Sequence, residues 1–302
     1  MNILKSYKLA TILFLGCSVS AIAQTGSTAD KASSVDVGAV NKEWQVSLRP
    51  DGAYDKVAHV SKAMPWQQLR EDDVMWKKRV WREIDVRQKQ NMPFIYPGDE
   101  NTGGGSFIEI LIDAVKRGKI MAYSPMDERF TAAFTKDQIM DVLVGKPDTV
   151  MVEDLETGEM KQVISRTEFD PNAITKFRIK EDVIFDRNLG RRVTRIIGLA
   201  PLLDKKSSSG EFIGNAPFFW LYYPDIRDVL AQYEVFNPEN DVARMTWDDY
   251  FEGRFFASYI YKISNPFDAR FKDLGMSEMD VLNEGQRVSE DLMNKEHDMW
   301  VY

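Results

Sequence analysis

The segment from residue 216 to residue 263 is dense in aromatic side chains and divided by clear boundary signals, so it limits how this chain can fold. Residues 218–223 are too few for a helix and are mostly aromatic, which predicts a buried strand. Pro224 ends that strand, and apolar residues at helical spacing after Asp225 predict a helix.

A second helix is predicted to begin at Thr246, because Thr246 and Asp249 have the spacing of a capping box. Its apolar and aromatic residues are expected to be Trp247, Tyr250, Phe251, Phe255, Tyr259 and Ile260. Each buried aromatic side chain removes about 150–250 Å² from water, so this segment is predicted to be the packing centre of the core. No reaction centre is evident in it.

The N-terminus has the pattern of a secretory signal peptide. Lys5 and Lys8 precede an apolar run over residues 9–23, which is too short for a membrane span and ends in a small-residue motif. This pattern predicts cleavage after Ala23 and a mature protein outside the cytoplasm. The only cysteine, Cys17, lies inside this segment, so the mature chain would have no thiol chemistry. Residues 14–17 also resemble a bacterial lipobox, and lipidation of Cys17 is the alternative.

The 302 residues suffice for one large domain or two small ones. Residues 24–70 are polar and lack periodicity, so we expect a flexible or partly ordered arm, followed by a core domain over 71–276 and a helical tail over 277–302. The formal net charge of -8 argues against a general nucleic-acid binder.

Residues 71–91 are predicted to form the first strong helix. Its apolar face would hold residues spaced by four, and another face would hold basic residues; the candidate contact residues on this helix are Trp76, Lys78, Trp81, Arg82 and Lys89. The basic face is either simply solvated or a docking surface for an acidic partner. Trp247 and Tyr250 complete the set of candidate contacts.

The rest of the chain predicts an α+β fold. Helices are expected over residues 107–117 and from Thr135. A short strand is expected at residues 120–123, and a hairpin over residues 149–169. Two further strands and the strand at 218–223 complete a mostly antiparallel meander of about five strands, packed with N-terminal and C-terminal helices. The charge-rich tail has a narrow apolar face, so we expect it to extend and pack on a neighbour.

The sequence leads us to expect no catalytic, metal-binding or cofactor-binding residues. The only histidines, His59 and His297, have no partners at metal-ligand spacing. Asp225, Asp248 and Glu252 lie near helix starts, where acids usually have a structural role. A carboxylate-dependent periplasmic hydrolase or a ligand-binding module is the alternative to a non-enzymatic role.

Several long strings of residues are distinctive. They are D-V-M-W-K-K-R-V-W-R-E-I-D-V-R-Q-K-Q-N within 72–91, F-I-Y-P at 94–97, I-K-E-D-V-I-F-D-R-N-L-G-R at 179–191 and I-I-G-L-A-P at 196–201. The longest run covers 219–251 and begins F-W-L-Y-Y-P-D-I-R-D-V-L. Together these strings resemble the GldN/PorN family of gliding-motility proteins.

The resemblance implies a periplasmic, non-enzymatic component of the type IX secretion system, with no catalytic residues or cofactors to carry over. Family members form a ring with a GldK/PorK-like outer-membrane lipoprotein and contact a GldM/PorM-like motor component. The lipobox-like string at Cys17 departs from the family, in which the lipid anchor belongs to the partner.

Overall fold

The computed structural model describes residue 53 and residues 62–98, 105–144, 148–153, 160–165, 169–206, 212–240 and 242–300. The chain divides into Met1–Glu43 and Trp44–Tyr302, and every described residue belongs to the second unit. The predicted signal peptide with Cys17, and most of the predicted arm, lie outside the described residues.

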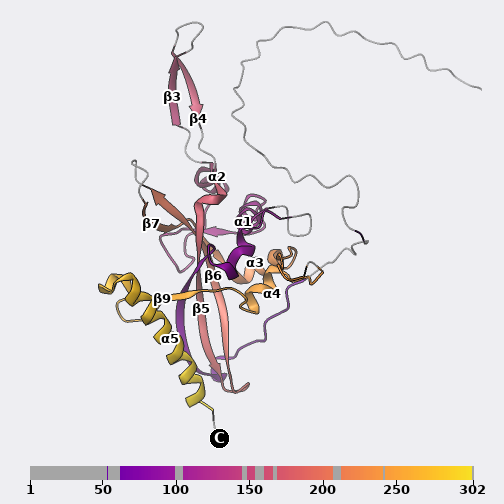
Figure 1. Ribbon diagram of the computed structural model, residues 1–302, viewed down its shortest axis with the longest axis vertical. Helices are drawn as coiled ribbons and strands as arrows, with labels where there is room; N and C mark the ends of the chain where they lie inside the picture. The colour runs from indigo at the N-terminus through magenta and orange to yellow at the C-terminus, as the bar shows by residue number, and fades with distance from the viewer. Residues whose placement is uncertain are drawn as a thin grey trace, which may run out of the picture. The chain divides into compact units, whose positions relative to one another are not determined.

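The described part of the chain contains both helices and strands, which confirms the α+β prediction (Figure 1). The helices are α1 (Phe107–Lys116), α2 (Lys136–Val144), α3 (Tyr223–Leu230), α4 (Trp247–Glu252) and α5 (Glu278–Asp298), with short 3₁₀-helices η1 (Glu71–Asp73), η2 (Lys89–Ile95), η3 (Pro171–Ala173) and η4 (Lys272–Leu274). The strands are β1 (Val74–Asp85), β2 (Ala122–Tyr123), β3 (Asp148–Glu153), β4 (Met160–Ser165), β5 (Ile174–Asp186), β6 (Arg191–Lys206), β7 (Phe212–Pro217), β8 (Trp220–Tyr222) and β9 (Tyr259–Ile263).

Seven strands form one antiparallel sheet in the order β2-β8-β6-β5-β1-β9, with β7 also paired to β6. The long β5–β6 hairpin is its centre (Figure 1). The predicted antiparallel sheet is therefore confirmed, but the simple meander is wrong in detail. The predicted hairpin β3–β4 forms a two-stranded sheet of its own, because its hydrogen bonds join only these two strands.

The predicted helix over residues 71–91 is wrong, because most of this segment is strand β1. Trp76, Val80 and Ile84 are spaced by four, which fits one face of a strand as well as one face of a helix. β1 is paired on both sides, with β5 and with β9. These two partners lie far away in sequence, and their hydrogen bonds decide between the two periodicities.

The helix predicted from Thr246 is real but shorter than expected. The Thr246–Asp249 capping box is present, and α4 ends at Gly253. Arg254 then takes a left-handed conformation with φ of 55°, so the helix does not continue. Tyr259 and Ile260 consequently lie in strand β9 rather than in the helix.

The main sheet has two faces of opposite chemistry. The helix face includes Ile84, Phe177 and Ile179, and it packs against apolar residues of α1, α3 and α4. The polar face is the opposite side of β1 and β5, where Glu83 and Arg178 are cross-strand partners. In a strand, successive side chains point to opposite sides, so one sequence supplies both faces.

Helix α5 packs on strand β9 and belongs to the body of the molecule (Figure 1). Val288 and Leu292 are buried against Ile260, so the expectation that this tail extends away is corrected. A side chain at Gly285 would bring its Cβ to 2.4 Å from the backbone oxygen of Ile260. The glycine that interrupts the apolar face is therefore what allows the helix to approach the strand so closely.

Candidate functional site

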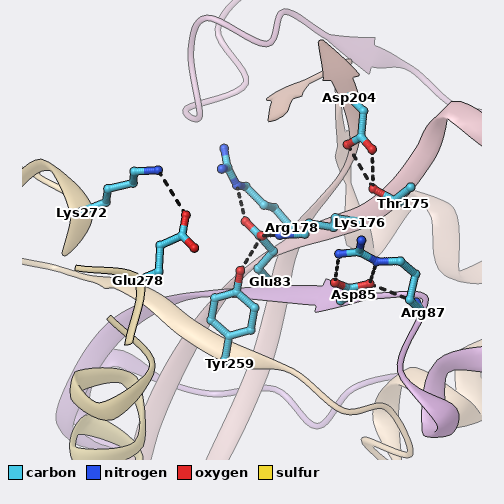
Figure 2. A network of polar contacts seen from close by, with 10 residues as sticks. All are labelled: Glu83, Asp85, Arg87, Thr175, Lys176, Arg178, Asp204, Tyr259, Lys272 and Glu278. Carbon is cyan, nitrogen blue, oxygen red and sulfur yellow. Dashed lines mark hydrogen bonds and ion pairs between the residues drawn. The ribbon is translucent and has the colours of Figure 1, made fainter. Parts of the chain in front are cut away.

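Glu83 is the centre of a buried network on the polar face (Figure 2). Its carboxylate accepts hydrogen bonds from Tyr259 Oη at 2.6 Å, from Lys176 Nζ at 2.9 Å and from Arg178 Nε at 3.3 Å. The donors come from β5 and β9, the two strands that flank β1. The three strands are thus joined by one carboxylate as well as by their backbone hydrogen bonds.

The network also fixes the charge of Glu83. Burial by itself would raise the pKa of this carboxyl, but the hydrogen bonds from Tyr259 and Lys176 and the charges of Arg178 and Lys176 hold its pKa below the usual value. Tyr259 is affected in the opposite sense, because burial and the Glu83 charge raise the pKa of its hydroxyl. Glu83 is therefore an anion and Tyr259 a donor around neutral pH.

Two neighbouring acids of β5 lie on opposite faces of the sheet, and each is bound by basic side chains. Glu181 is fully buried and accepts from Arg82 Nε at 2.6 Å and from Arg254 Nη2 at 2.8 Å. Asp182 accepts from Arg79 Nε at 2.6 Å and lies 2.7 Å from Lys77 Nζ. The candidate contact residue Arg82 thus has a structural partner within the chain.

The structure separates the remaining candidate contact residues of β1 and η2. Trp76 is half-buried and packs against the cluster beneath α5, Lys78 is half-buried, and Lys89 is exposed. Trp81 is buried on the polar face. A shared basic helix face does not exist, because Lys89 lies in η2 and the other residues lie in β1.

Trp247 and Tyr250 lie inside the aromatic core on the helix face. Each is 3% exposed, and both rings are within 6 Å of the ring of Phe94. The aromatic segment is thus the packing centre that its composition predicts, and neither side chain reaches the surface of this chain.

The acids considered for catalysis have structural surroundings. Arg227 donates to both carboxylate oxygens of buried Asp248, at 2.8 and 2.9 Å, and Glu252 lies 4.0 Å from the same guanidinium. Trp66, from the predicted arm, packs over Arg227 with 4.8 Å between the guanidinium carbon and the ring centroid. Asp225 is exposed at the start of α3. Asp248 is therefore occupied by an arginine, which is the surrounding of a structural acid rather than of a catalytic one.

The outer side of α5 is an acidic surface with apolar residues. Seven acidic and two basic side chains give this helix a formal charge of −5, out of −8 for the whole chain. Met279, Leu282 and Met293 are 67%, 46% and 53% exposed, at positions that share one side of the helix. We call these three residues the α5 stripe. The narrow apolar face expected from the sequence comprises Val281, Leu282, Val288 and Leu292. Val288 and Leu292 are buried and Val281 is partly buried, whereas Leu282 is exposed in the stripe. Met279 and Met293 were not part of that expectation.

Within the described ranges, no group of three histidine, cysteine or acidic residues is arranged to hold a metal ion. The helices described here also include none that is long and apolar enough to cross a membrane.

The family model described as "Gliding motility associated protein GldN" matches residues 69–301. This chain belongs to the GldN family. GldN membership implies a component of the gliding-motility and type IX secretion machinery, and the GldN family is not a known enzyme family. No curated protein sequence matches the chain.

Proposed function

We propose that this protein is a non-enzymatic structural subunit of the type IX secretion and gliding machinery. It acts in the periplasm, associates with the inner face of the outer membrane, and forms a ring with a GldK/PorK-like lipoprotein. It also contacts a GldM/PorM-like motor component. The observation that carries the proposal is the GldN family match over residues 69–301. The buried acids described above support a non-enzymatic role, since their carboxylates are already bound by basic side chains of the same chain.

The α5 stripe is the contact surface that we assign to this role. Exposed apolar residues next to acidic residues suit a partner segment with apolar and basic side chains. Trp76, Lys78 and Lys89 are further contact candidates, since each has exposed surface in the single chain. Trp81, Trp247 and Tyr250 are buried, so we assign them to the interior instead.

The test is affinity purification of the tagged mature chain from detergent-solubilised envelopes, followed by size-exclusion chromatography and mass spectrometry. We expect a very large species that contains the lipoprotein. A free monomer without the lipoprotein would contradict the proposal.

A matched pair of variants then tests the surface. Met279→Ser, Leu282→Ser and Met293→Ser together should release the chain from the large species, while the isolated chain loses only about 1 kcal/mol in free energy of unfolding through lower helix propensity and stays folded. The control carries Asn283→Ser and Asn294→Ser, two exposed polar positions on the same helix, and should assemble normally. Equal assembly of both variants would exclude the α5 stripe as the contact.

Periplasmic targeting is tested by N-terminal sequencing of the mature chain. We expect it to begin at Gln24, after the motif ending at Ala23. A mature chain that begins at Cys17 and incorporates labelled palmitate would show lipidation instead.

A further inference from the structure

Four buried donor groups on the polar face have no hydrogen-bond partner among the residues that the structure describes. They are Trp81 Nε1, Trp220 Nε1, Arg178 Nη1 and Tyr261 Oη, from residues that are at most 6% exposed. Among the described residues, one other buried side-chain atom, Trp66 Nε1, shares this property. Native proteins leave few buried polar groups unpaired, so four in one area need an explanation.

These four groups belong to one packed cluster. Trp81, Trp220 and Tyr261 pack together with Ala200, which is the cross-strand partner of Arg178. The guanidinium carbon of Arg178 lies 4.8 Å from the centroid of the Tyr261 ring. Figure 2 shows the terminal nitrogens of Arg178 pointing away from Glu83, which binds only Nε.

The unpaired groups of the cluster are hydrogen-bond donors, so a ligand that binds them must be a hydrogen-bond acceptor. Indole and guanidinium groups only donate hydrogen bonds. Burial raises the pKa of Tyr261, so its hydroxyl stays protonated and is available as a further donor. A single water molecule accepts at most two hydrogen bonds, which is fewer than the four donor groups, and the nearby Glu83 carboxylate already accepts three hydrogen bonds.

The charged residues around the cluster favour a ligand that carries negative charge. Lys176 and Arg178 share a single anion, Glu83, so one positive charge next to the cluster is not balanced by that carboxylate. Lys262 Nζ lies 4.3 Å from the Trp81 ring centroid, but it is paired with Asp268 at 2.9 Å and with Glu128 at 3.6 Å. Lys180 donates to the backbone oxygen of Glu128 at 2.6 Å, and burial and the neighbouring Arg79 charge lower its pKa. A group that accepts several hydrogen bonds and carries negative charge fits best, and a carboxylate has both properties.

The loop between β2 and α2 covers this cluster. Phe130 takes φ of 60°, which is unusual for a bulky residue, and its ring packs edge-on against Trp220. A Cβ on Gly198 would lie 2.7 Å from this ring, so the glycine makes room for it. Displacing Phe130 is therefore the step that would open the cluster from the polar side.

We propose that Trp81, Arg178, Trp220 and Tyr261 form a binding site for a carboxylate, which enters when Phe130 is displaced. The carboxylate comes either from an acidic segment of another polypeptide or from a small organic acid. The site does not depend on the ring, so its failure and the failure of the proposed function are separate results.

The first experiment uses two probes on the purified mature chain. One is glutarate, and the other is an acetylated, amidated Gly-Glu-Gly-Glu-Gly peptide, with the Gly-Gln-Gly-Gln-Gly peptide as control. Because Trp81 and Trp220 belong to the site, we expect binding to change tryptophan emission and to raise Tm. Binding of glutarate alone identifies a small acid, and binding of the Glu peptide alone identifies a polypeptide. No response to either probe would overturn the proposal.

The second experiment compares two tyrosines of the same strand. Tyr261→Phe removes a hydroxyl without a partner, so Tm of the free chain should stay the same or rise, whereas the probe should bind about 5- to 10-fold more weakly. Tyr259→Phe removes a hydrogen bond to Glu83, so Tm should fall. If Tyr261→Phe lowers Tm as much as Tyr259→Phe, the hydroxyl has a partner in the free chain and the proposal is wrong.

Discussion

Near the centre of the main sheet both faces bury side chains, most of them apolar on the helix face and charged on the polar face. On the helix face, Ile84, Phe177 and Ile179 are at most 2% exposed. On the polar face, Glu83, Arg178 and Lys180 are 4–6% exposed. The same two strands, β1 and β5, supply both sets. Burial alone therefore does not separate structural from functional surfaces in this protein.

The two faces differ in what their buried side chains require of their neighbours. Apolar contacts are not directional, so the apolar residues of the helix face need only the right volume. Buried Glu181, which binds Arg82 and Arg254, is the exception on that face. Each charge on the polar face needs a partner at the right distance and angle, and most have one. Substitutions on the helix face should thus remove buried area, whereas substitutions on the polar face should leave an uncompensated charge. The following predictions separate these two effects.

The largest effect is expected for Phe107→Ala on the helix face. The Phe107 ring packs against the rings of Phe94, Phe177 and Trp247, with centroids 4.3–5.4 Å away. The cavity should lower the free energy of unfolding by about 3–5 kcal/mol, measured by urea denaturation. Phe267→Ala is the control, because this ring is 81% exposed, and its effect should stay within about 0.5 kcal/mol. Similar losses for both variants would contradict the assignment of the core.

A smaller effect is expected for Glu83→Gln on the polar face. The variant keeps the size of the side chain but leaves Lys176 and Arg178 without their anion. The free energy of unfolding should fall by about 2–3 kcal/mol in urea denaturation. Arg87→Ala is the matched control, since its pair with Asp85 is on the surface, and it should cost less than about 1 kcal/mol. A loss for Glu83→Gln no larger than the loss for Arg87→Ala would show that the network contributes little.

The sequence predicted the elements whose signals are local. α1 and α5 have capping boxes and apolar periodicity, and both helices form close to where they were expected. The strand at 218–223 was also predicted to join the sheet, and β8 pairs with β6. The family resemblance was carried by long strings of residues and is confirmed over residues 69–301.

Elements that depend on distant partners were not predicted correctly. The spacing of Trp76, Val80 and Ile84 fits a helix and a strand, and the deciding pairs of β1 lie about a hundred residues later, as with Arg82 and Glu181. The unpartnered donors were missed for the same reason. Arg178 and Lys180 alternate with apolar residues in the sequence, which is typical of one face of a strand, but Trp81, Trp220 and Tyr261 reach that face from three other strands.

A third prediction concerns the contact between α5 and β9. Gly285→Ala improves helix propensity, but its Cβ would lie 2.4 Å from the backbone oxygen of Ile260, so α5 must shift. We expect the clash to exceed the gain in propensity and to destabilise the chain by about 1–2 kcal/mol. Asn283→Ala on the exposed side of the same helix should stabilise slightly, by a few tenths of a kcal/mol in the same urea assay. A more stable Gly285→Ala chain would mean that α5 is not held this closely.

The last prediction concerns acid, where the two faces should respond differently. The pKa of Glu83 is lowered from 4.5 in the folded chain, because the hydrogen bonds and cations around it outweigh its burial. A carboxyl with a lowered folded-state pKa contributes its full stability above its unfolded pKa. That contribution is lost as the pH falls through the lower folded-state pKa. The gap in unfolding free energy between wild type and Glu83→Gln should therefore be constant from about pH 7 to about pH 5 and shrink below that.

The helix face supplies the control for the acid experiment. Phe107→Ala changes no titrating group, so its gap to wild type should stay the same over the whole pH range, even though both proteins lose stability in acid as Asp182 and Asp85 are protonated. Urea denaturation of the three proteins at each pH measures both gaps. Parallel curves for all three would show that Glu83 titrates as in the unfolded chain, and the polar face would then be stabilised by packing rather than by charge.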